Sequence, residues 1–352
     1  MKNIAIQAAK LAAVSVAVTA SLTSLSYAQN SNVTLFGVVD TNVQRFSATG
    51  AASVTRVGSD GLTSSRYGLR GTEDLGNGLR ASFWLEGAFA TDTGALANTN
   101  SNNQSTGSTS SLFGRRSTLS LAGGFGELRL GRDLTPVFLN LSEFNVAGTN
   151  GTGNAGAMFY PQFTSYTHVR ASNGVSYLTP AMGGFYAHAT YAFGENSANS
   201  DGRYFGVRVG YRAGPFSAGV GTSKTNYLSG NQTQTTAGAS YDLKVAKLTA
   251  LYARNKKGTV DNSAIHVGAT VPFGATSLRL GYTDARLKGG DGANQIQIGV
   301  IHDLSKRTAL YFDASQIDNK GKGRNFGLSD GIKPVTPGGK STGYEAGIRH
   351  TF

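Results

Sequence analysis

The sequence predicts an all-β protein: a closed antiparallel barrel of about sixteen strands that spans a membrane. Three observations lead to this fold class. Apolar and polar residues alternate at every second position in many segments, and short turns alternate with long loops along the chain. Glycine is abundant (48 of 352 residues) while proline is rare (7), which is typical of many strands and turns rather than of a disordered tract.

The alternation begins in the first segment after the N-terminal region, residues 33–43. Val33, Leu35 and Val39 share one face of a strand there, whereas Asp40 and Asn42 share the other. Every such segment therefore has an apolar face and a face of Gly, Ser, Thr, Gln and Arg. The pattern recurs in segments 79–89, 185–193, 205–212, 267–273, 278–282, 296–300 and 343–352.

Two kinds of connection separate these segments. The short ones are rich in turn residues, whereas the long ones, such as 47–62, 94–111 and 317–342, are Gly/Ser/Asn loops. Short turns at one end and long loops at the other are typical of an outer-membrane barrel, with the turns and both termini in the periplasm. The seven short turns are 73–78, 123–127, 180–184, 212–215, 242–247, 272–276 and 303–308.

Residues 1–28 have the features of a secretory signal peptide. Lys2 and Lys10 flank a polar start, an apolar run follows, and residues 26–28 match a small-x-small cleavage site. A transmembrane anchor is the alternative, but the run is shorter than the ~20 apolar residues that a spanning helix needs. We expect export, followed by a single barrel domain over residues 29–352.

Other classes of protein fit less well. A soluble β-sandwich or binding barrel is the alternative fold, but a sandwich of this many strands would leave exposed edges. Cysteine is absent and the five histidines show no metal-ligand spacing, so we expect neither a metal nor a cofactor. The G-x-S-x-G match at 327–331 lies in a Gly/Lys-rich loop without the strand and helix of a nucleophile elbow, so we expect no enzyme.

A barrel of about sixteen strands encloses an aqueous channel, and one connection is suited to narrow it. Residues 134–173 form a long third loop with many apolar side chains, which predicts that the loop folds inward against the wall. Glu143 is its only carboxylate between Leu134 and Val169, and no Lys or Arg occurs there. A cation-selective constriction would be expected to carry several acidic residues.

Arginines supply the charge of the predicted channel. Guanidinium groups stay ionised at any relevant pH, and several of them in a narrow bore enrich anions. The sequence has a formal net charge of +12, so we expect small anions as permeating solutes. The alternative is that these arginines are ordinary lumen residues balanced by acids, or that they bind lipid head groups. The candidates are Arg66, Arg70, Arg80, Arg115, Arg116, Arg129 and Arg170.

Strict alternation conflicts with one of these candidates. Leu119 and Leu121 are in phase with Arg115, so Arg116 would face the lumen and Arg115 the lipid. An arginine near mid-bilayer costs about 2–4 kcal/mol. A bulge near Gly114, or a position beyond the lipid, would relieve the conflict. Both residues remain candidates.

Several stretches resemble the Gram-negative trimeric porins, particularly their anion-selective branch. They are "NVTLFGVVDTNV", "SSRYGLRGTEDLGNGLRASFWLEGAF", "RRSTLSLAGGFGELRLGRDLTP", "VSYLTPAMGGFYAHATYAFGE" and the terminal "GIRHTF". The resemblance implies a homotrimer of 16-stranded barrels with an inward third loop and a basic constriction formed by Arg66, Arg115 and Arg170. The family also has a lysine from the last long loop at the constriction. Lys333 is the possible counterpart here, but the sequence around it differs from the family pattern, so this role is not assigned to it.

The expected partners follow from an outer-membrane barrel, and one alternative function stays open. Outer-membrane lipid and lipopolysaccharide would surround the barrel, and nucleic acid would play no part. Phe352, the terminal aromatic residue, resembles the signature by which outer-membrane proteins are recognised for assembly. A solute-specific channel for phosphate or organic acids is the alternative to a general anion channel.

Overall fold

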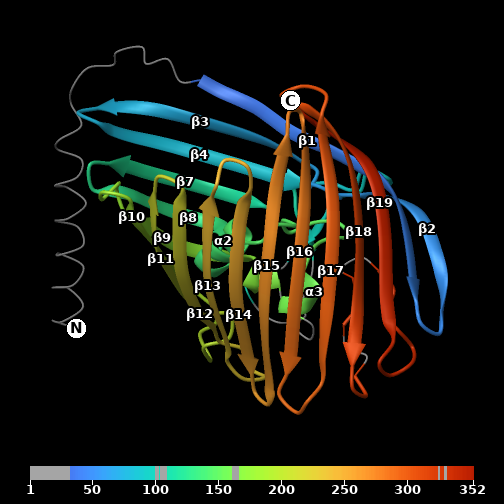
Figure 1. The fold of residues 1–352 in the computed structure, drawn as a ribbon. Helices are drawn as coiled ribbons and strands as arrows, with labels where there is room; N and C mark the ends of the chain where they lie inside the picture. Colours follow the sequence, from blue (N-terminus) through green and yellow to red (C-terminus); the bar gives the residue numbers. More distant parts are fainter. Residues whose placement is uncertain (1–31, 100–102, 104–108, 161–165, 324–325, 329–330) are drawn as a thin grey trace.

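The protein is a closed antiparallel barrel (Figure 1). The computed structural model describes residues 32–99, 103, 109–160, 166–323, 326–328 and 331–352. The predicted signal peptide, 1–28, lies outside the described residues and stays a prediction. Seventeen strands form one sheet. The first strand, β1 (Asn32–Ala48), pairs with the last, β19 (Lys340–Thr351), so the sheet closes on itself.

Seventeen strands fill sixteen positions in the wall, as the sequence predicts, because two of them share one place. The first part of β1 pairs with β3 (Arg66–Gly76), and its second part pairs with β2 (Ala51–Ser59). Both neighbours lie on the same side of β1, one beyond the other. Residues 60–65 cross between them, which places Arg66 at the point where the wall resumes.

The β1–β2 hairpin corrects the prediction that residues 47–62 form a loop. Strand β1 continues to Ala48, and β2 returns along it through a turn at Gly50, whose φ is +78°. Val57 pairs with the exposed Val43 of the outer face, whereas Val54 pairs with the buried Phe46 of the inner face, and most of β2 is exposed whichever way it points. The last predicted loop, 317–342, is also shorter, since the flanking strands reach Lys320 and Lys340.

The seven predicted short turns are confirmed, because each joins two neighbouring strands. A small separate hairpin of β5 (Asn98–Thr99) and β6 (Thr109–Ser110) lies in the predicted loop 94–111. The other strands of the wall are β4 (Leu79–Ala88), β7 (Arg116–Gly123), β8 (Gly126–Leu134), β9 (Arg170–Leu178), β10 (Phe185–Ala192), β11 (Tyr204–Ala213), β12 (Phe216–Thr225), β13 (Gln232–Asp242), β14 (Lys247–Lys257), β15 (Val260–Phe273), β16 (Thr276–Leu287), β17 (Gly292–Asp303) and β18 (Thr308–Lys320).

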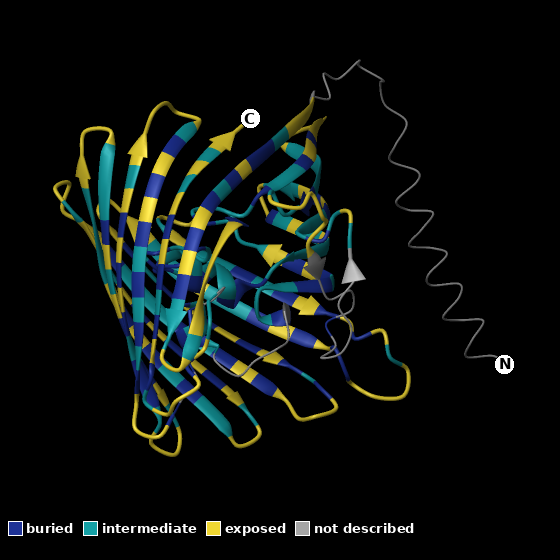
Figure 2. Cartoon of the chain, turned by 90° about the vertical axis from the view of Figure 1, so that its right-hand side faces the viewer, coloured by how far each residue is buried: buried dark blue, intermediate teal, exposed yellow. Residues whose placement is uncertain are grey.

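Burial along the strands is inverted relative to a soluble protein, and buried and exposed residues alternate in bands (Figure 2). On β15, Ile265 is 57% exposed while its neighbour His266 is 1% exposed. On β13, Gln234 is 2% exposed. Apolar side chains outside and polar side chains inside are what a lipid-facing wall around an aqueous lumen requires.

The C-terminal residue completes the wall. The main-chain N–H of Phe352 donates to the oxygen of Gly37 at 3.0 Å, and the N–H of Gly37 donates to the oxygen of Phe352 at 3.1 Å. The Phe352 ring lies over Gly37, where a Cβ atom would collide with it. The alternating last segment is therefore a closing strand; the assembly role of Phe352 stays a prediction.

The third long connection folds into the barrel, as predicted. Its first helix, α2 (Pro136–Glu143), packs on β11, β12 and β13, and a short helix, α3 (Gly156–Phe159), packs on β14, β15 and β16. A 3-10 turn, η1 (Tyr166–His168), leads back to β9. Among the described residues, no helix has both the length and the apolar character needed to cross a membrane.

Apolar side chains fasten this loop. Phe144, Met158 and Phe159 are fully buried, in one cluster with Phe46 of β1 and Phe326 of the last long loop. The main hydrophobic core thus lies inside the barrel, between the two loops and one side of the wall. The open part of the lumen lies toward the other side, along β3, β4, β7 and β8.

Candidate functional site

A cavity of about 790 Å³ lies among the long loops, and we call it the outer cavity. Arg66, Arg115 and Arg170 all line it. Each is at the start of a wall strand: Arg66 begins β3, Arg170 begins β9, and Arg115 directly precedes β7. The structure therefore brings together the three arginines that the family resemblance singled out.

One carboxylate, Glu86 on β4, contacts two of these arginines. Its Oε1 lies 2.5 Å from Nε of Arg115 and 3.9 Å from Nε of Arg66. Arg170 instead donates a hydrogen bond of 2.9 Å from Nε to the main-chain oxygen of Arg115. One carboxylate therefore accompanies three guanidinium groups and contacts two of them, so the group as a whole is positive.

Glu86, the carboxylate that pairs with Arg66 and Arg115, is not itself part of the lining of the outer cavity. Among the residues that the structure describes, no Asp or Glu lines it, whereas Lys333 from the last long loop does. This loop enters the barrel mouth because Phe326 and Leu328 pack into the interior core. The sequence left the place of Lys333 open, since tertiary packing rather than a local pattern determines it.

Arg115 and Arg116 both avoid the lipid. Strand β7 starts at Arg116, which is in phase with the buried Thr118 and Ser120 and points inward. Arg115 lies before the strand, where its N–H donates to the oxygen of Glu86 at 3.0 Å. The conflict found in the sequence disappears because the alternation does not extend to Arg115. The two arginines line different cavities.

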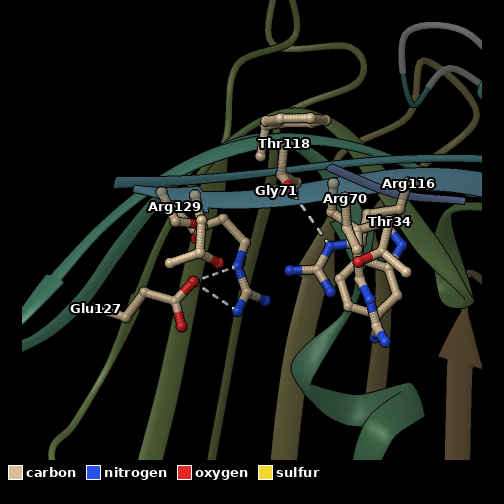
Figure 3. Close-up of a pocket in the computed structure, with 12 residues that line it drawn as sticks. Thr34, Arg70, Gly71, Arg116, Thr118, Glu127 and Arg129 are labelled. Carbon is tan, nitrogen blue, oxygen red and sulfur yellow. Dashed lines mark hydrogen bonds and ion pairs between the residues drawn. The ribbon is translucent and has the colours of Figure 1, made fainter. Parts of the chain in front are cut away.

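A second cavity of about 580 Å³, the inner cavity, lies nearer the short turns and is lined by Arg70, Arg116 and Arg129 (Figure 3). The guanidinium carbon of Arg116 lies 4.6 Å from the centre of the Trp84 ring, and that of Arg70 lies 5.2 Å from it. Both contacts are within the range of cation–π attraction. The indole therefore holds two arginine heads in the lumen.

The remaining predicted arginines differ in how far acids balance them. Arg129 lies 2.7 Å from Glu127 and 2.6 Å from Asp133, so two carboxylates neutralise it. Arg116 is 3.5 Å from the same Asp133. Arg80 is exposed near the β3–β4 turn and lines neither cavity. The structure thus separates Arg80 from the other candidates.

Glu143, the single carboxylate of the inward loop, points at the wall. Its Oε1 lies 2.6 Å from Arg212 and accepts a hydrogen bond of 2.8 Å from Ser217, and Oε2 lies 3.5 Å from Arg208. Burial by itself raises the pKa of the Glu143 carboxyl. The hydrogen bonds from Arg212 and Ser217 and the nearby arginine charges outweigh this effect and hold the pKa below its ordinary value. Glu143 therefore attaches α2 to the wall, and its charge is paired there and not with the arginines of the outer cavity.

Sequence reasoning missed two residues of the site. Trp84 follows the same period as Arg80, Ser82 and Glu86, so the alternation could have placed it in the lumen. Arg132 donates hydrogen bonds to the Gly114 oxygen at 2.7 Å and to Ser172 at 2.6 Å, which fastens the segment before Arg115. No local pattern signals Arg132, because its partners come from two other parts of the chain.

Comparisons with known proteins agree with this architecture. A family model described as Gram-negative porin matches residues 12–322. Outer membrane porin protein 32 of Delftia acidovorans is 40% identical over 349 residues, covering 92% of this chain and 94% of that protein. An outer membrane porin protein of Bordetella pertussis is 29% identical over 390 residues, covering 91% of this chain and 94% of that protein.

Solved structures give the same picture. The anion-selective porin from Comamonas acidovorans superposes with a TM-score of 0.79 at 38% identity, covering 92% of this chain and all of that one. OmpT of Vibrio cholerae has a TM-score of 0.64 at 17% identity, covering 94% of this chain and 100% of that one, which shows the fold alone. A related structure of OmpT is described as a trimer form. This chain belongs to the Gram-negative porins of the outer membrane.

Proposed function

We propose that this porin passes small anions in preference to cations, and that Arg66, Arg115 and Arg170 set this preference. The observation that carries the proposal is the lining of the outer cavity: four basic side chains and, among the described residues, no carboxylate. A porin is a passive channel, so selectivity arises from the potential at its narrowest part. Guanidinium groups beside a low-dielectric wall make that potential positive at any relevant pH.

The inward loop supports the same proposal from the opposite side. Its single carboxylate, Glu143, is paired with Arg208 and Arg212, which leaves no free acid to face the arginines. The loop instead presents Thr149 and Asn150 to the outer cavity. A permeating anion would meet arginine on one side and neutral hydrogen-bonding groups on the other.

Reversal potentials in planar bilayers under a KCl gradient test the proposal. We expect a potential of the sign that chloride preference produces, and a smaller anion preference in Arg66→Ser and Arg170→Ser. Arg80→Ser is the matched control, since Arg80 lines neither cavity. Cation preference in the unmodified channel would refute the proposal, and equal effects of all three substitutions would remove Arg66 and Arg170 from the site.

A solute-specific channel for phosphate or organic acids is the second candidate, and the inner cavity favours it. Arg70 lines this cavity, and its head packs against Phe36 and Trp84 rather than against an acid. Trp84 is the single tryptophan of the chain, so its fluorescence reports on this cavity. Saturable quenching by phosphate or succinate, but not by chloride, would favour a specific channel.

A homotrimer is the assembly that the wall supports. Strands β7 and β10 have 8 residues each, whereas β15 has 14. A tilted strand needs about 9–11 residues to span a bilayer. In a trimer, neighbouring subunits would cover the part of the wall that is formed by these short strands. A heat-resistant oligomer on a denaturing gel, dissociated by boiling, is the expected result.

Lipopolysaccharide is the lipid that the outer rim fits. Above the apolar band, the outward face of β14, β16 and β18 carries Arg254, Arg286 and Lys320, which pair with Asp261 and Asp284. Phosphate groups with bound divalent cations could contact both signs of charge in this belt. Co-purification of lipopolysaccharide that decreases in Arg254→Ser and Arg286→Ser would support this contact.

The described residues give us no ground to propose a catalytic step.

A further inference from the structure

Behind the constriction, the wall has a continuous buried network that none of the pore-lining arginines belongs to. Its members are Asp40 and Asn42 on β1, Tyr311 on β18 and Glu345 on β19. All four are buried, with exposed fractions between 0% and 4%. They come from three neighbouring strands, where β1 and β19 close the barrel.

Asp40 holds the segment that leads into Arg66. Its Oδ2 accepts hydrogen bonds from the main-chain N–H groups of Leu62 and Thr63 at 2.9 and 2.7 Å. Its main-chain oxygen accepts the hydroxyl of Ser65, the residue before Arg66, at 3.0 Å. Leu62 and Thr63 themselves line the outer cavity. Asp40 thus fixes the arginine side of the constriction.

Glu345 holds the opposite side. Its Oε1 accepts the main-chain N–H of Thr152 at 2.7 Å, in the part of the inward loop next to Asn150. Asn150 lines the outer cavity and accepts the Ser64 hydroxyl at 2.8 Å. One carboxylate therefore anchors the segment 62–65 and another anchors the inward loop.

Tyr311 and Asn42 join these two anchors. The Tyr311 hydroxyl donates to Oδ1 of Asp40 at 2.5 Å, and it accepts from Nδ2 of Asn42 at 3.1 Å. The same Nδ2 lies 3.2 Å from Oε2 of Glu345. Gly61 and Gly347 flank the Tyr311 ring, and a Cβ atom at either would collide with it. The ring therefore has one position, with its hydroxyl between the two anchors.

We propose that Tyr311 is a positioning residue, which with Asn42 couples the Asp40 and Glu345 anchors and so fixes the gap between Arg66 and the inward loop. Tyr311 touches no permeating ion. Its loss leaves every charge in place but weakens the connection between the segment 62–65 and the loop, which then depends more on the Ser64–Asn150 hydrogen bond. The part of the inference that concerns selectivity rests on the proposed anion preference; the part that concerns the width of the gap does not.

Tyr311→Phe in full-length protein, reconstituted in planar bilayers, tests the inference. We expect open-channel current noise to rise about fivefold, the population change that loss of one typical buried hydrogen bond produces, together with a lower anion preference. Tyr252→Phe on the outward face of β14 is the matched control and should behave like the unmodified channel. Noise and selectivity equal to those of the unmodified channel in Tyr311→Phe would overturn the inference. A noise change in a channel that prefers cations would refute the proposed function and leave the positioning role standing.

Asp40→Ala gives an independent answer with a sign. If Asp40 acted only through its charge, its removal would increase anion preference, because a negative charge beside the lumen is lost. A positioning role predicts the opposite, a decrease, and Asp40→Asn, which keeps an acceptor for Leu62 and Thr63, should restore most of it. An increase in Asp40→Ala would overturn the inference even if Tyr311→Phe failed to assemble.

Discussion

Replacing Glu86 by Gln should make the channel more selective for anions. Glu86 is the carboxylate shared by Arg66 and Arg115, and its side chain is 11% exposed. Gln keeps the shape and one oxygen that can accept from Arg115, but it loses the second acceptor, Oε2, which now takes the Trp84 indole N–H at 3.0 Å. The substitution therefore removes one negative charge while the arginines stay in place.

The size of the effect follows from Coulomb's law. For an ion about 10 Å from the carboxylate in water, one unit charge changes the energy by about 0.4 kcal/mol, with opposite signs for anion and cation. The permeability ratio should then rise about fourfold without screening. At an ionic strength of about 0.1 M, where the Debye length is ~10 Å, we expect about twofold.

Reversal potentials measure this ratio directly. Glu73→Gln is the control, because it makes the same chemical change on the exposed outer face of β3 and should leave the ratio unaltered. The gain in Glu86→Gln should also shrink near 1 M salt, where the Debye length is about 3 Å. A permeability ratio that stays constant or falls in Glu86→Gln would show that the Glu86 charge does not lower anion preference, and a fall would mean that Glu86 acts by holding Arg115.

Three further substitutions probe other parts of the channel. Lys333→Gln should reduce anion preference less than Arg66→Ser, because Lys333 is one flexible charge on a loop; a larger effect than that of Arg66→Ser would contradict this. Phe159→Ala should loosen the inward loop, at a cost of about 3–5 kcal/mol for a buried ring, and change single-channel conductance; unaltered conductance and noise would argue against this packing. Glu143→Gln should lower the thermal stability of the channel at pH 7. The pKa of Glu143 is lower in the folded protein than in the unfolded chain. The ionised carboxylate therefore stabilises the fold at pH values above its unfolded-state pKa, and this stabilisation is lost as the pH falls through the folded-state pKa. The difference in melting temperature should therefore vanish in acid, and a difference that persists there would exclude the ion pairs as its cause.

The wall could be predicted from the sequence because its rule is local. Each strand alternates between lipid and water, so positions such as Val33 and Asp40 reveal their faces without knowledge of their neighbours. The short turns are equally local, since Gly, Asn and Asp residues determine them. The β1–β2 hairpin differs from the prediction because Ala, Ser and Gly give it the composition of a loop, and its exposed residues show no clear alternation.

The site could be predicted only in part. Arg66, Arg115 and Arg170 are candidates from the charge of the predicted channel, and the family resemblance singles them out of seven arginines. Strict alternation would instead place Arg115 in the lipid. The pairing of Glu143 with Arg212, the entry of Lys333 and the position of Tyr311 were not foreseen. These depend on how the long loops pack inside the barrel, where residues more than 60 positions apart in sequence meet. No pattern within one strand encodes such contacts.

The proposed anion preference requires that the outer cavity present a net positive charge to permeating ions. Its most direct test is the reversal potential of the unmodified channel in a planar bilayer under a tenfold KCl gradient near 0.1 M, where screening extends about 10 Å. We expect a reversal potential close to the equilibrium potential of chloride, and a potential nearer to zero in Arg66→Ser. A potential of the opposite sign, on the potassium side, would contradict it.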